Sequence, residues 1–325
     1  MNNIITASRQ NSLLHCARAH FWAYEIGLQK ETTSIALHFG SAWHRAMEYR
    51  WLGKSYDDAL AYAIPEGIEL DQMTCSTIAA LLAGYYDHYG TRERVGKLNP
   101  EEEFEHPIEG TNFTARGKID GLGTLKRGGS VIVESKTTGD SITPDSDYWL
   151  RLRFNIQLYQ YYDAALNKGW DIREVIYDVT RKPSIRPKAI GKKELKHKET
   201  PDEFCDRLYQ DTLVRPEFYF CRKEVPILES DFQQFKNQRV ALCRMIEDFR
   251  AHENCEPYLG QRDQEAWPRN VSTNTCNFCA YKSFCLQNIQ PDLDHLPEGF
   301  SIGKFNPELS YDTTPETENT VDSAA

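Results

Sequence analysis

The sequence predicts an α/β protein in which helices cover a mixed β-sheet. Three observations support this class. Apolar residues recur at helical spacing through the first 90 residues, short apolar runs bounded by glycine follow in the middle, and helical and strand-like segments alternate after that. Helices placed before, between and after the strands are typical of a sheet covered by helices.

The amino-terminal part is expected to be helical. Ser8 can cap a helix whose apolar residues include Leu13 and Phe21. The expected helices cover residues 8–29, 33–51, 55–64 and 75–90. Gly40 lies inside the second of them, and because a glycine there costs up to about 1 kcal/mol relative to alanine, it indicates close packing of the backbone against a neighbour.

The strands are expected to begin near residue 103. Strand patterns cover residues 103–108, 112–123, 130–137, 170–181 and 217–225. Helical patterns cover residues 145–167, 201–212 and 230–252. The segment between 181 and 198 contains two prolines, so it is predicted to be a loop or an irregular hairpin.

The hairpin at 117–139 carries candidate catalytic residues. Asp120 ends the first run, and Glu134, Ser135 and Lys136 follow an apolar run. Glu134 and Lys136 share a face because side chains alternate along a strand. Two carboxylates can hold a hard divalent cation, and an ammonium can position a water or neutralise a phosphate, which suits phosphodiester hydrolysis. The alternative is a solvated hairpin edge with an ordinary salt bridge.

The register of this hairpin decides whether the two acids can act together. A turn centred on Gly128 and Gly129 would place Asp120 on the face opposite Glu134. A bulge or a one-residue shift is therefore required if both acids belong to one site.

Two helices offer further candidates. His44 lies within the helix over 33–51, where a single histidine is more often a core or surface residue than a ligand. Gln157 and Tyr161 are four residues apart, so they share a face of the helix over 145–167. Both could equally be polar members of an amphipathic helix.

Charge is distributed unevenly along the chain. The formal net charge is −10, of which residues 291–325 contribute −7. Residues 181–198 instead hold eight bases and one acid. This basic strip could follow a phosphate backbone, or it could be a solvated loop. Its candidate nucleic-acid-binding residues are Arg181, Lys182, Arg186, Lys188, Lys192 and Lys193.

The cysteines predict a metal centre. Cys276, Cys279 and Cys285 form a C-x2-C-x5-C cluster, and a closed site needs a fourth ligand. Cys16 is the remaining candidate, because the other cysteines lie in predicted core elements. Spacing alone leaves zinc, an iron–sulfur cluster and a site without metal open.

No apolar run approaches the roughly 20 residues that span a bilayer, and no targeting segment is evident, so we expect a cytoplasmic protein.

Taken together, these residues resemble the PD-(D/E)XK nuclease superfamily, and specifically its RecB-like, Cas4-like branch with a four-cysteine iron–sulfur cluster. The resemblance runs from Ser8 to Cys285. It rests on the order of Cys16, Gly40 to His44, Gly117 to Asp120, Glu134 to Lys136, Gln157 to Tyr161, and the cysteines at 276, 279 and 285.

The resemblance implies a restriction-endonuclease-like fold and a metal-dependent DNA nuclease, most simply an exonuclease on single strands or DNA ends. Mg²⁺ or Mn²⁺ would be held by Asp120, Glu134, the carbonyl of Ser135 and His44, with Lys136, Gln157 and Tyr161 assisting. A [4Fe-4S] cluster on the four cysteines would be structural.

The implied domain is a single one over residues 1–290. It would contain a helical cap (about 30–95), a nuclease core (about 100–225) and a carboxyl-terminal helix with the cysteines (about 228–290), followed by a disordered acidic tail (291–325). Recombination, repair, replication or CRISPR-type proteins are the implied partners, in a bacterial or viral setting. Two other functions remain open: a non-catalytic nucleic-acid-binding module, and a zinc-stapled scaffold protein on the same fold.

Overall fold

The computed structural model describes residues 2–31, 35–65, 70–190, 197–253, 262–303 and 305–309. The chain divides into two compact units. Unit 1 comprises Met1–Thr32, Pro107–Gly117 and Arg239–Ala325, and unit 2 comprises Thr33–His106 and Lys118–Gln238. Among the described residues, every helix is too short or too polar to cross a membrane.

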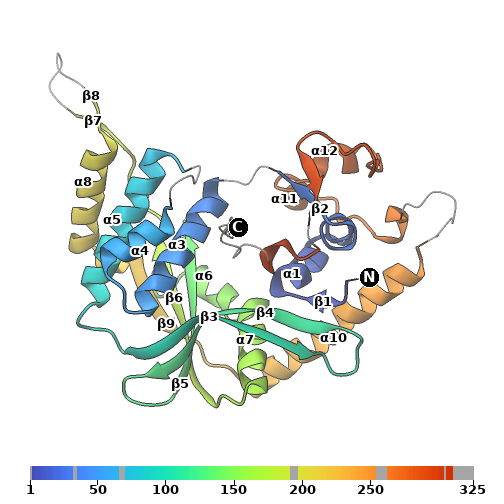
Figure 1. The fold of residues 1–325 in the computed structure, drawn as a ribbon, viewed down its shortest axis with the longest axis horizontal. Helices are drawn as coiled ribbons and strands as arrows, with labels where there is room; N and C mark the ends of the chain where they lie inside the picture. The colour runs from blue at the N-terminus through green and yellow to red at the C-terminus, as the bar shows by residue number, and fades with distance from the viewer. Residues whose placement is uncertain are drawn as a thin grey trace, which may run out of the picture. The chain divides into compact units, whose positions relative to one another are not determined.

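The main sheet is mixed, as predicted. Its strands follow the order β1-β4-β5-β6-β9, and β3 also pairs with β4 (Figure 1). β4 is antiparallel to β5, β5 is parallel to β6, and β6 is antiparallel to β9. The bounds are β1 (Ile4–Ile5), β3 (Val95–Pro107), β4 (Thr114–Leu125), β5 (Ser130–Thr138), β6 (Ile172–Arg181) and β9 (Phe220–Glu224).

In unit 2, helices cover both faces of this sheet. Val131 and Val133 of β5 share a hydrophobic core with the cap helices α3 (Ile35–Trp51), α4 (Tyr56–Ala63), α5 (Gln72–Tyr89), α8 (Pro201–Val214) and α9 (Pro216–Tyr219). The alternate residues of β5 face the other way, toward α6 (Asp147–Leu152) and α7 (Ile156–Asn167). Lys136, for example, reaches Gln157 of α7. The face of β5 that carries the predicted catalytic residues is therefore the α7 face.

The hairpin between β4 and β5 has a register that brings the two acids together. Its ladder runs from Thr124 opposite Ser130 to Gly121 opposite Val133, so the turn is centred on Arg127 and not on the glycine pair. Continued by one residue, this register sets Asp120 opposite Glu134, and directly opposed residues share a face. The register therefore differs from the one centred on Gly128 and Gly129, and both acids lie on one face of the hairpin.

Two predicted helices are broken in the structure. The helix expected over 145–167 is split into α6 and α7, because the Asn155 side chain accepts a hydrogen bond from the backbone N–H of Gln157 and caps α7. The helix expected over 8–29 is divided into α1 (Ala7–His15), α2 (Ala17–His20) and a π-helix, η1 (Phe21–Ile26). Cys16 has an extended backbone (φ −165°) at the first of these breaks.

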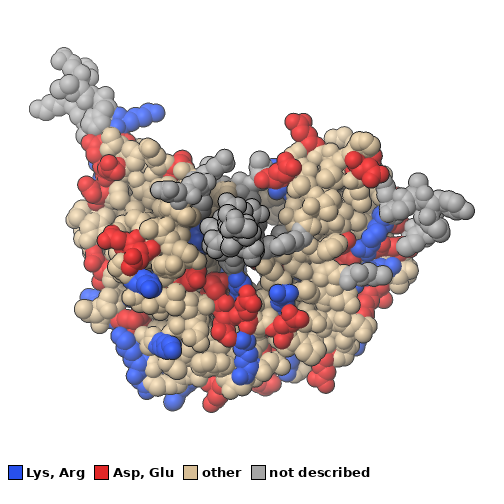
Figure 2. Space-filling model, in the orientation of Figure 1, with Lys and Arg blue, Asp and Glu red and all other residues tan. Residues whose placement is uncertain are grey.

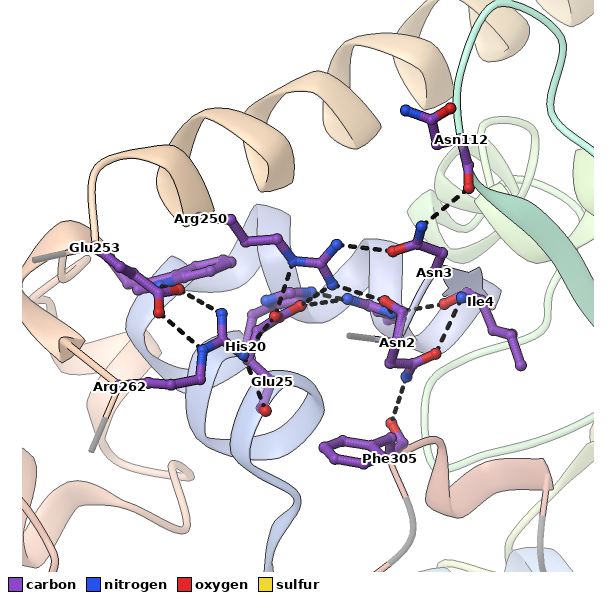
Figure 3. Close-up of polar contacts among 12 residues, drawn as sticks. Asn2, Asn3, Ile4, His20, Glu25, Asn112, Arg250, Glu253, Arg262 and Phe305 are labelled. Carbon is purple, nitrogen blue, oxygen red and sulfur yellow. Dashed lines mark hydrogen bonds and ion pairs between the residues drawn. The ribbon is translucent and has the colours of Figure 1, made fainter. Parts of the chain in front are cut away.

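Unit 1 is built around a buried carboxylate. Glu25 of η1 accepts hydrogen bonds from Arg9 (2.5 Å) near the amino terminus and from Arg250 (2.8 Å) and Arg262 (2.8 Å), more than 200 residues later (Figure 3). Arg250 lies near the end of α10 (Glu229–Ala251), and the remaining elements of unit 1 after it are η2 (Gln264–Ala266), α11 (Thr273–Cys276), α12 (Lys282–Cys285), β10 (Phe300–Ile302) and η3 (Pro307–Leu309). The shared carboxylate therefore ties the amino-terminal helices to the carboxyl-terminal segment.

The described residues of the acidic segment after residue 290 include the strand β10 and the short helix η3. β10 is antiparallel to β2 (Leu28–Lys30), with Phe300 opposite Lys30. Glu308 of η3 accepts a hydrogen bond from the Tyr24 hydroxyl (3.4 Å). Although the segment is acidic, its Phe300 side chain is nearly buried in unit 1, with a relative exposure of 9%. Residues 310–325 lie outside the described residues.

A close helix contact occurs at Gly84 and not at Gly40. A Cβ added to Gly84 of α5 would collide with the side chain of Thr212 on α8. A Cβ at Gly40 of α3 would meet nothing within 4 Å in the described part of the chain, so the expectation of close packing there is wrong. The cap therefore depends on a small residue where α5 meets α8.

We predict opposite effects of alanine at these two glycines. Gly84→Ala should lower the free energy of unfolding by about 1–3 kcal/mol, the usual cost of overpacking. Gly40→Ala should leave it unchanged or raise it by up to about 1 kcal/mol, because alanine is the better helix former. Urea unfolding followed by circular dichroism measures both variants, and a Gly84→Ala protein as stable as the wild type would contradict the proposed contact.

Candidate active site

Four of the predicted residues form one hydrogen-bonded chain in unit 2. The Lys136 ammonium of β5 donates to Gln157 Oε1 (2.7 Å), and Gln157 Nε2 donates to the Tyr161 hydroxyl (2.7 Å). The Tyr161 hydroxyl donates to Asp120 Oδ1 (3.0 Å), while the backbone N–H of Ser135 donates to Asp120 Oδ2 (3.1 Å). Residues of β4, β5 and α7 are thereby fixed relative to one another.

Glu134 lies at the buried end of this arrangement. It is 0% exposed, and its Oε1 is ion-paired with Lys136. Its Oε2 accepts no hydrogen bond from the described residues. Burial, together with the nearby Asp120, raises the pKa of Glu134 to about 8 although Lys136 opposes the shift. The pKa of Lys136 is raised because the two carboxylates outweigh the effect of burial.

His44 of α3 extends the site toward solvent. Its Nδ1 lies 3.4 Å from Asp120 Oδ2, and its side chain is 34% exposed. Burial lowers the pKa of His44, with Asp120 acting in the opposite direction. The imidazole is thus held beside the carboxylate in the state that can serve as a metal ligand.

The structure adds one acid that the sequence analysis did not identify. Ligand atoms of His44, Glu101 and Asp120 all lie within 4.8 Å of one another. Burial and the neighbouring Asp120 raise the pKa of Glu101 to about 7. Its only signal in the sequence was a run of three glutamates, 101–103, which is a common surface pattern and does not single out one residue.

This set of groups fits a hard divalent cation. Carboxylate oxygens and one imidazole are ligands that Mg²⁺ or Mn²⁺ accept. Three carboxylates, of Glu101, Asp120 and Glu134, lie close to one another here, with Lys136 beside Glu134 and Lys118 near Glu101. Acidic side chains also gather over β3 and β4 on the face shown in Figure 2. The site therefore has an excess of negative charge that a bound cation would offset.

The described part of the basic strip borders a pocket of unit 2. Lys182 and Arg186 line this pocket together with Phe39, Ile185 and Phe204. The Lys182 ammonium lies 4.7 Å from the centre of the Phe39 ring, and the Arg181 guanidinium lies 4.2 Å from the Phe218 ring. The backbone N–H of Lys188 donates to Glu199 (3.0 Å) before the short strands β7 (Ala189–Ile190) and β8 (His197–Lys198). Lys192 and Lys193 lie outside the described residues.

The four predicted cluster cysteines line one pocket of unit 1. Cys16 lies between α1 and α2, Cys276 and Cys285 end α11 and α12, and Cys279 lies in the turn between those two helices. The backbone N–H of Asn270 points at Cys16 Sγ (3.5 Å). The hydroxyl of Tyr281 donates to the carbonyl of Leu28 (2.8 Å) and holds the turn against β2. The break in the amino-terminal helix is what presents Cys16 to this pocket.

The sequence and the structure were compared with known families, curated proteins and solved structures. The model of the PD-(D/E)XK nuclease superfamily matches residues 4–286. A solved structure described as "Crystal structure of SSO0001" aligns over 89% of each chain with 10% sequence identity and a TM-score of 0.33. No curated protein matches the sequence.

Proposed function

Because the chain belongs to the PD-(D/E)XK nuclease superfamily, we propose that it is a metal-dependent deoxyribonuclease. Its reaction would be hydrolysis of phosphodiester bonds, as an exonuclease on single strands or DNA ends. The observation that supports this most directly is the chain of hydrogen bonds from Lys136 through Gln157 and Tyr161 to Asp120. These hydrogen bonds fix the Asp120 carboxylate and the Lys136 ammonium relative to each other. A simple surface salt bridge does not require such a chain of bonds.

Asp120, Glu134, the carbonyl of Ser135 and His44 would hold a divalent cation. The free Oε2 of Glu134, fully buried and without a donor, is the feature that fits a cation there. When bound, Mg²⁺ or Mn²⁺ supplies Lewis acidity at a phosphate oxygen and lowers the pKa of a water molecule.

The other side chains have positioning roles in this proposal. Lys136, held by Gln157 and Glu134, would orient the attacking water or neutralise charge on a phosphate oxygen. Tyr161 donates to Asp120 and so keeps one carboxylate oxygen turned toward α7. Burial raises the pKa of Tyr161 well above its usual range, so its hydroxyl remains a donor.

The substrate strand would approach along the basic strip. Lys182 follows β6, and its backbone N–H donates to the carbonyl of Thr138, two residues beyond Lys136 on β5. The pocket lined by Lys182 and Arg186 is thus close in sequence and in the sheet to the catalytic strand. The cationic side chains of this pocket would contact the phosphates of a single strand, and its aromatic rings would stack on the bases. Recombination, repair, replication and CRISPR-type systems are the settings in which such an activity operates, and they imply a cytoplasmic location.

The cysteine pocket would hold an iron–sulfur cluster. Among the described residues, the one group of three or more ligand atoms within 4.8 Å of one another is His44, Glu101 and Asp120, so no three of the four thiols are that close. Thiolates on one zinc lie no more than about 4.6 Å apart, because each Zn–S bond is about 2.3 Å. The wider spacing favours a [4Fe-4S] cluster, in which each thiolate binds a separate iron.

We expect Asp120→Asn and Lys136→Ala each to lower DNA cleavage by at least about 10²-fold, because each removes several kcal/mol of transition-state stabilisation. The assay follows end-labelled single and double strands with Mg²⁺, Mn²⁺ or chelator. Lys168→Ala, which removes a lysine paired with Glu102 on the surface, is the matched control and should retain full activity. Metal-dependent cleavage by Asp120→Asn at the wild-type rate would show the site assignment to be wrong. A wild-type protein that binds DNA without cleaving it would favour the non-catalytic nucleic-acid-binding module.

Serine in place of any of Cys16, Cys276, Cys279 or Cys285 should remove the visible absorbance of an iron–sulfur cluster, because each thiolate binds one iron, and should lower the melting temperature. Cys75→Ser, a half-buried thiol of unit 2, should leave the spectrum unchanged. The measurement is a visible spectrum with iron and zinc analysis after anaerobic purification. A colourless wild type that contains zinc would support the scaffold function instead.

The basic strip should contribute to binding through phosphate contacts. In an Asp120→Asn background, Lys182→Ala combined with Arg186→Ala should reduce the slope of log K against log[salt] for a single strand by about 1.4, or about 0.7 for each lost contact. Lys126→Ala, at the exposed hairpin turn, should leave the slope unchanged. Fluorescence anisotropy across a salt series measures this, and equal slopes for all three proteins would reject the strip as the phosphate track.

A further inference from the structure

The cavity bordered by the basic strip differs in charge from the candidate active site. Its volume is about 430 Å³, within the range of about 300–1,000 Å³ that is typical of pockets for small molecules. Its lining includes two cations, Lys182 and Arg186, and none of its described lining residues is an acid. Met73, Ile185 and Phe204 contribute to an apolar wall. The cavity therefore offers positive charge and apolar surface together, without the excess of carboxylates found at the active site.

Lys182 is the cation placed to bind an anion inside this cavity. Its ammonium lies 4.7 Å from the centre of the Phe39 ring, and no acid among the described residues forms an ion pair with it. Burial lowers the pKa of Lys182, and no nearby carboxylate opposes that shift. Because an ammonium has three donors and this one has lost part of its hydration, a phosphate oxygen would be a favourable acceptor for it.

The wall that carries Arg186 is held in place by the protein itself. The Arg207 guanidinium of α8 donates two hydrogen bonds to the Glu199 carboxylate (both 2.6 Å) and one to the carbonyl of Arg186 (3.0 Å). Glu199 also accepts from the backbone N–H of Lys188 (3.0 Å). The segment from 186 to 188 is thus fixed before a ligand arrives, which lowers the entropy cost of binding.

The cavity shares two elements with the candidate active site. Phe39 lines the cavity from α3, the helix that carries His44. The backbone N–H of Lys182 donates to the carbonyl of Thr138 (2.7 Å), and Thr138 ends the strand β5 that carries Lys136. A strand bound at the acids of β4 and β5 would therefore have this cavity beside the same helix and the same strand.

We propose that this cavity binds one nucleoside monophosphate, with the phosphate at Lys182 and the base against the apolar wall. This inference deepens the proposed nuclease function, on which it rests for the choice of a nucleotide. A nucleoside monophosphate is the unit that an exonuclease removes, and it is also the terminal unit of the strand that remains. The cavity would hold the end of a strand, and the free nucleotide would compete for the same place. Binding here needs no divalent cation, because the protein supplies the positive charge.

The experiment measures binding of deoxyadenosine monophosphate to the full chain, in chelator and without DNA. Isothermal titration calorimetry should report one site per wild-type chain. Inorganic phosphate and deoxyadenosine each carry only one part of the ligand, so each should bind at least about tenfold more weakly, a loss of about 1.4 kcal/mol. Equal affinity for inorganic phosphate would indicate an anion site without a contact to the base, and it would overturn the proposal.

Three lysine variants test where the phosphate binds. Lys182→Met removes the charge and keeps an apolar stem over Phe39, and it should weaken binding of the nucleotide by at least about tenfold, as for a lost charge-assisted hydrogen bond. Lys182→Arg keeps the charge and should retain binding. Lys236 lies over the Phe232 ring (4.6 Å) outside the cavity, so Lys236→Met is the matched control and should bind as the wild type does.

Two outcomes contradict the proposal directly. One is a wild-type protein that does not bind the nucleotide, and the other is wild-type affinity in Lys182→Met. Because the titration contains neither metal nor DNA, its result is separate from that of the cleavage assay. A protein that binds the nucleotide and cleaves no DNA would uphold this inference and reject the proposed function. An active nuclease that does not bind the nucleotide would reject this inference alone.

Discussion

The burial of the Glu134 carboxylate is the constraint on which the arrangement of unit 2 depends. A carboxylate removed from water costs several kcal/mol unless opposite charge and donors replace its hydration. Among the residues that the structure describes, Lys136 is the cation paired with it, and Lys136 is itself held by Gln157 of α7. The helix on this face of the sheet is therefore positioned by polar contacts as well as by its apolar residues. Its break from α6 at Asn155 lets Gln157 begin the first turn, where its side chain meets the strand.

Buried charges are arranged in opposite ways in the two units. In unit 1, one carboxylate, Glu25, is surrounded by the guanidinium groups of three arginines. In unit 2, the carboxylates of Glu101, Asp120 and Glu134 lie close to one another, and Glu134 is paired with Lys136. The first arrangement is complete without any added ion and fits a structural role. The second retains an acceptor without a donor, and unsatisfied buried groups of this kind mark sites that bind something else.

Much of the site was predictable because its residues lie on regular elements. Strand alternation placed Glu134 and Lys136 on one face, and helical spacing placed Gln157 with Tyr161. The position of the hairpin turn was not predictable, since either Arg127 or the two glycines after it could be its centre. Glu101 was missed because its selection among three glutamates depends on a single backbone angle, its φ of +51°. Cys16 was expected within a continuous helix, whereas its backbone is extended between α1 and α2, and its side chain lines the cysteine pocket. The strand β10 depends on its pairing with β2, and amino-acid composition does not reveal that pairing.

The pairing of β10 with β2 has a consequence for how the protein is made. Residues 28–30 acquire their strand partner only when residues 300–302 have been synthesised. Unit 2 is complete, apart from the inserted segment 107–117, by residue 238. A ribosome adds about 5–20 residues each second, and domains fold as their residues emerge. The sheet with its acids can therefore form while the amino-terminal segment still has an unpaired strand edge and the Cys16 thiol still lacks the other three cysteines. The four cysteines are complete only at residue 285, after the last residue of unit 2, so a cofactor inserted on them would enter a protein whose other unit has been able to fold.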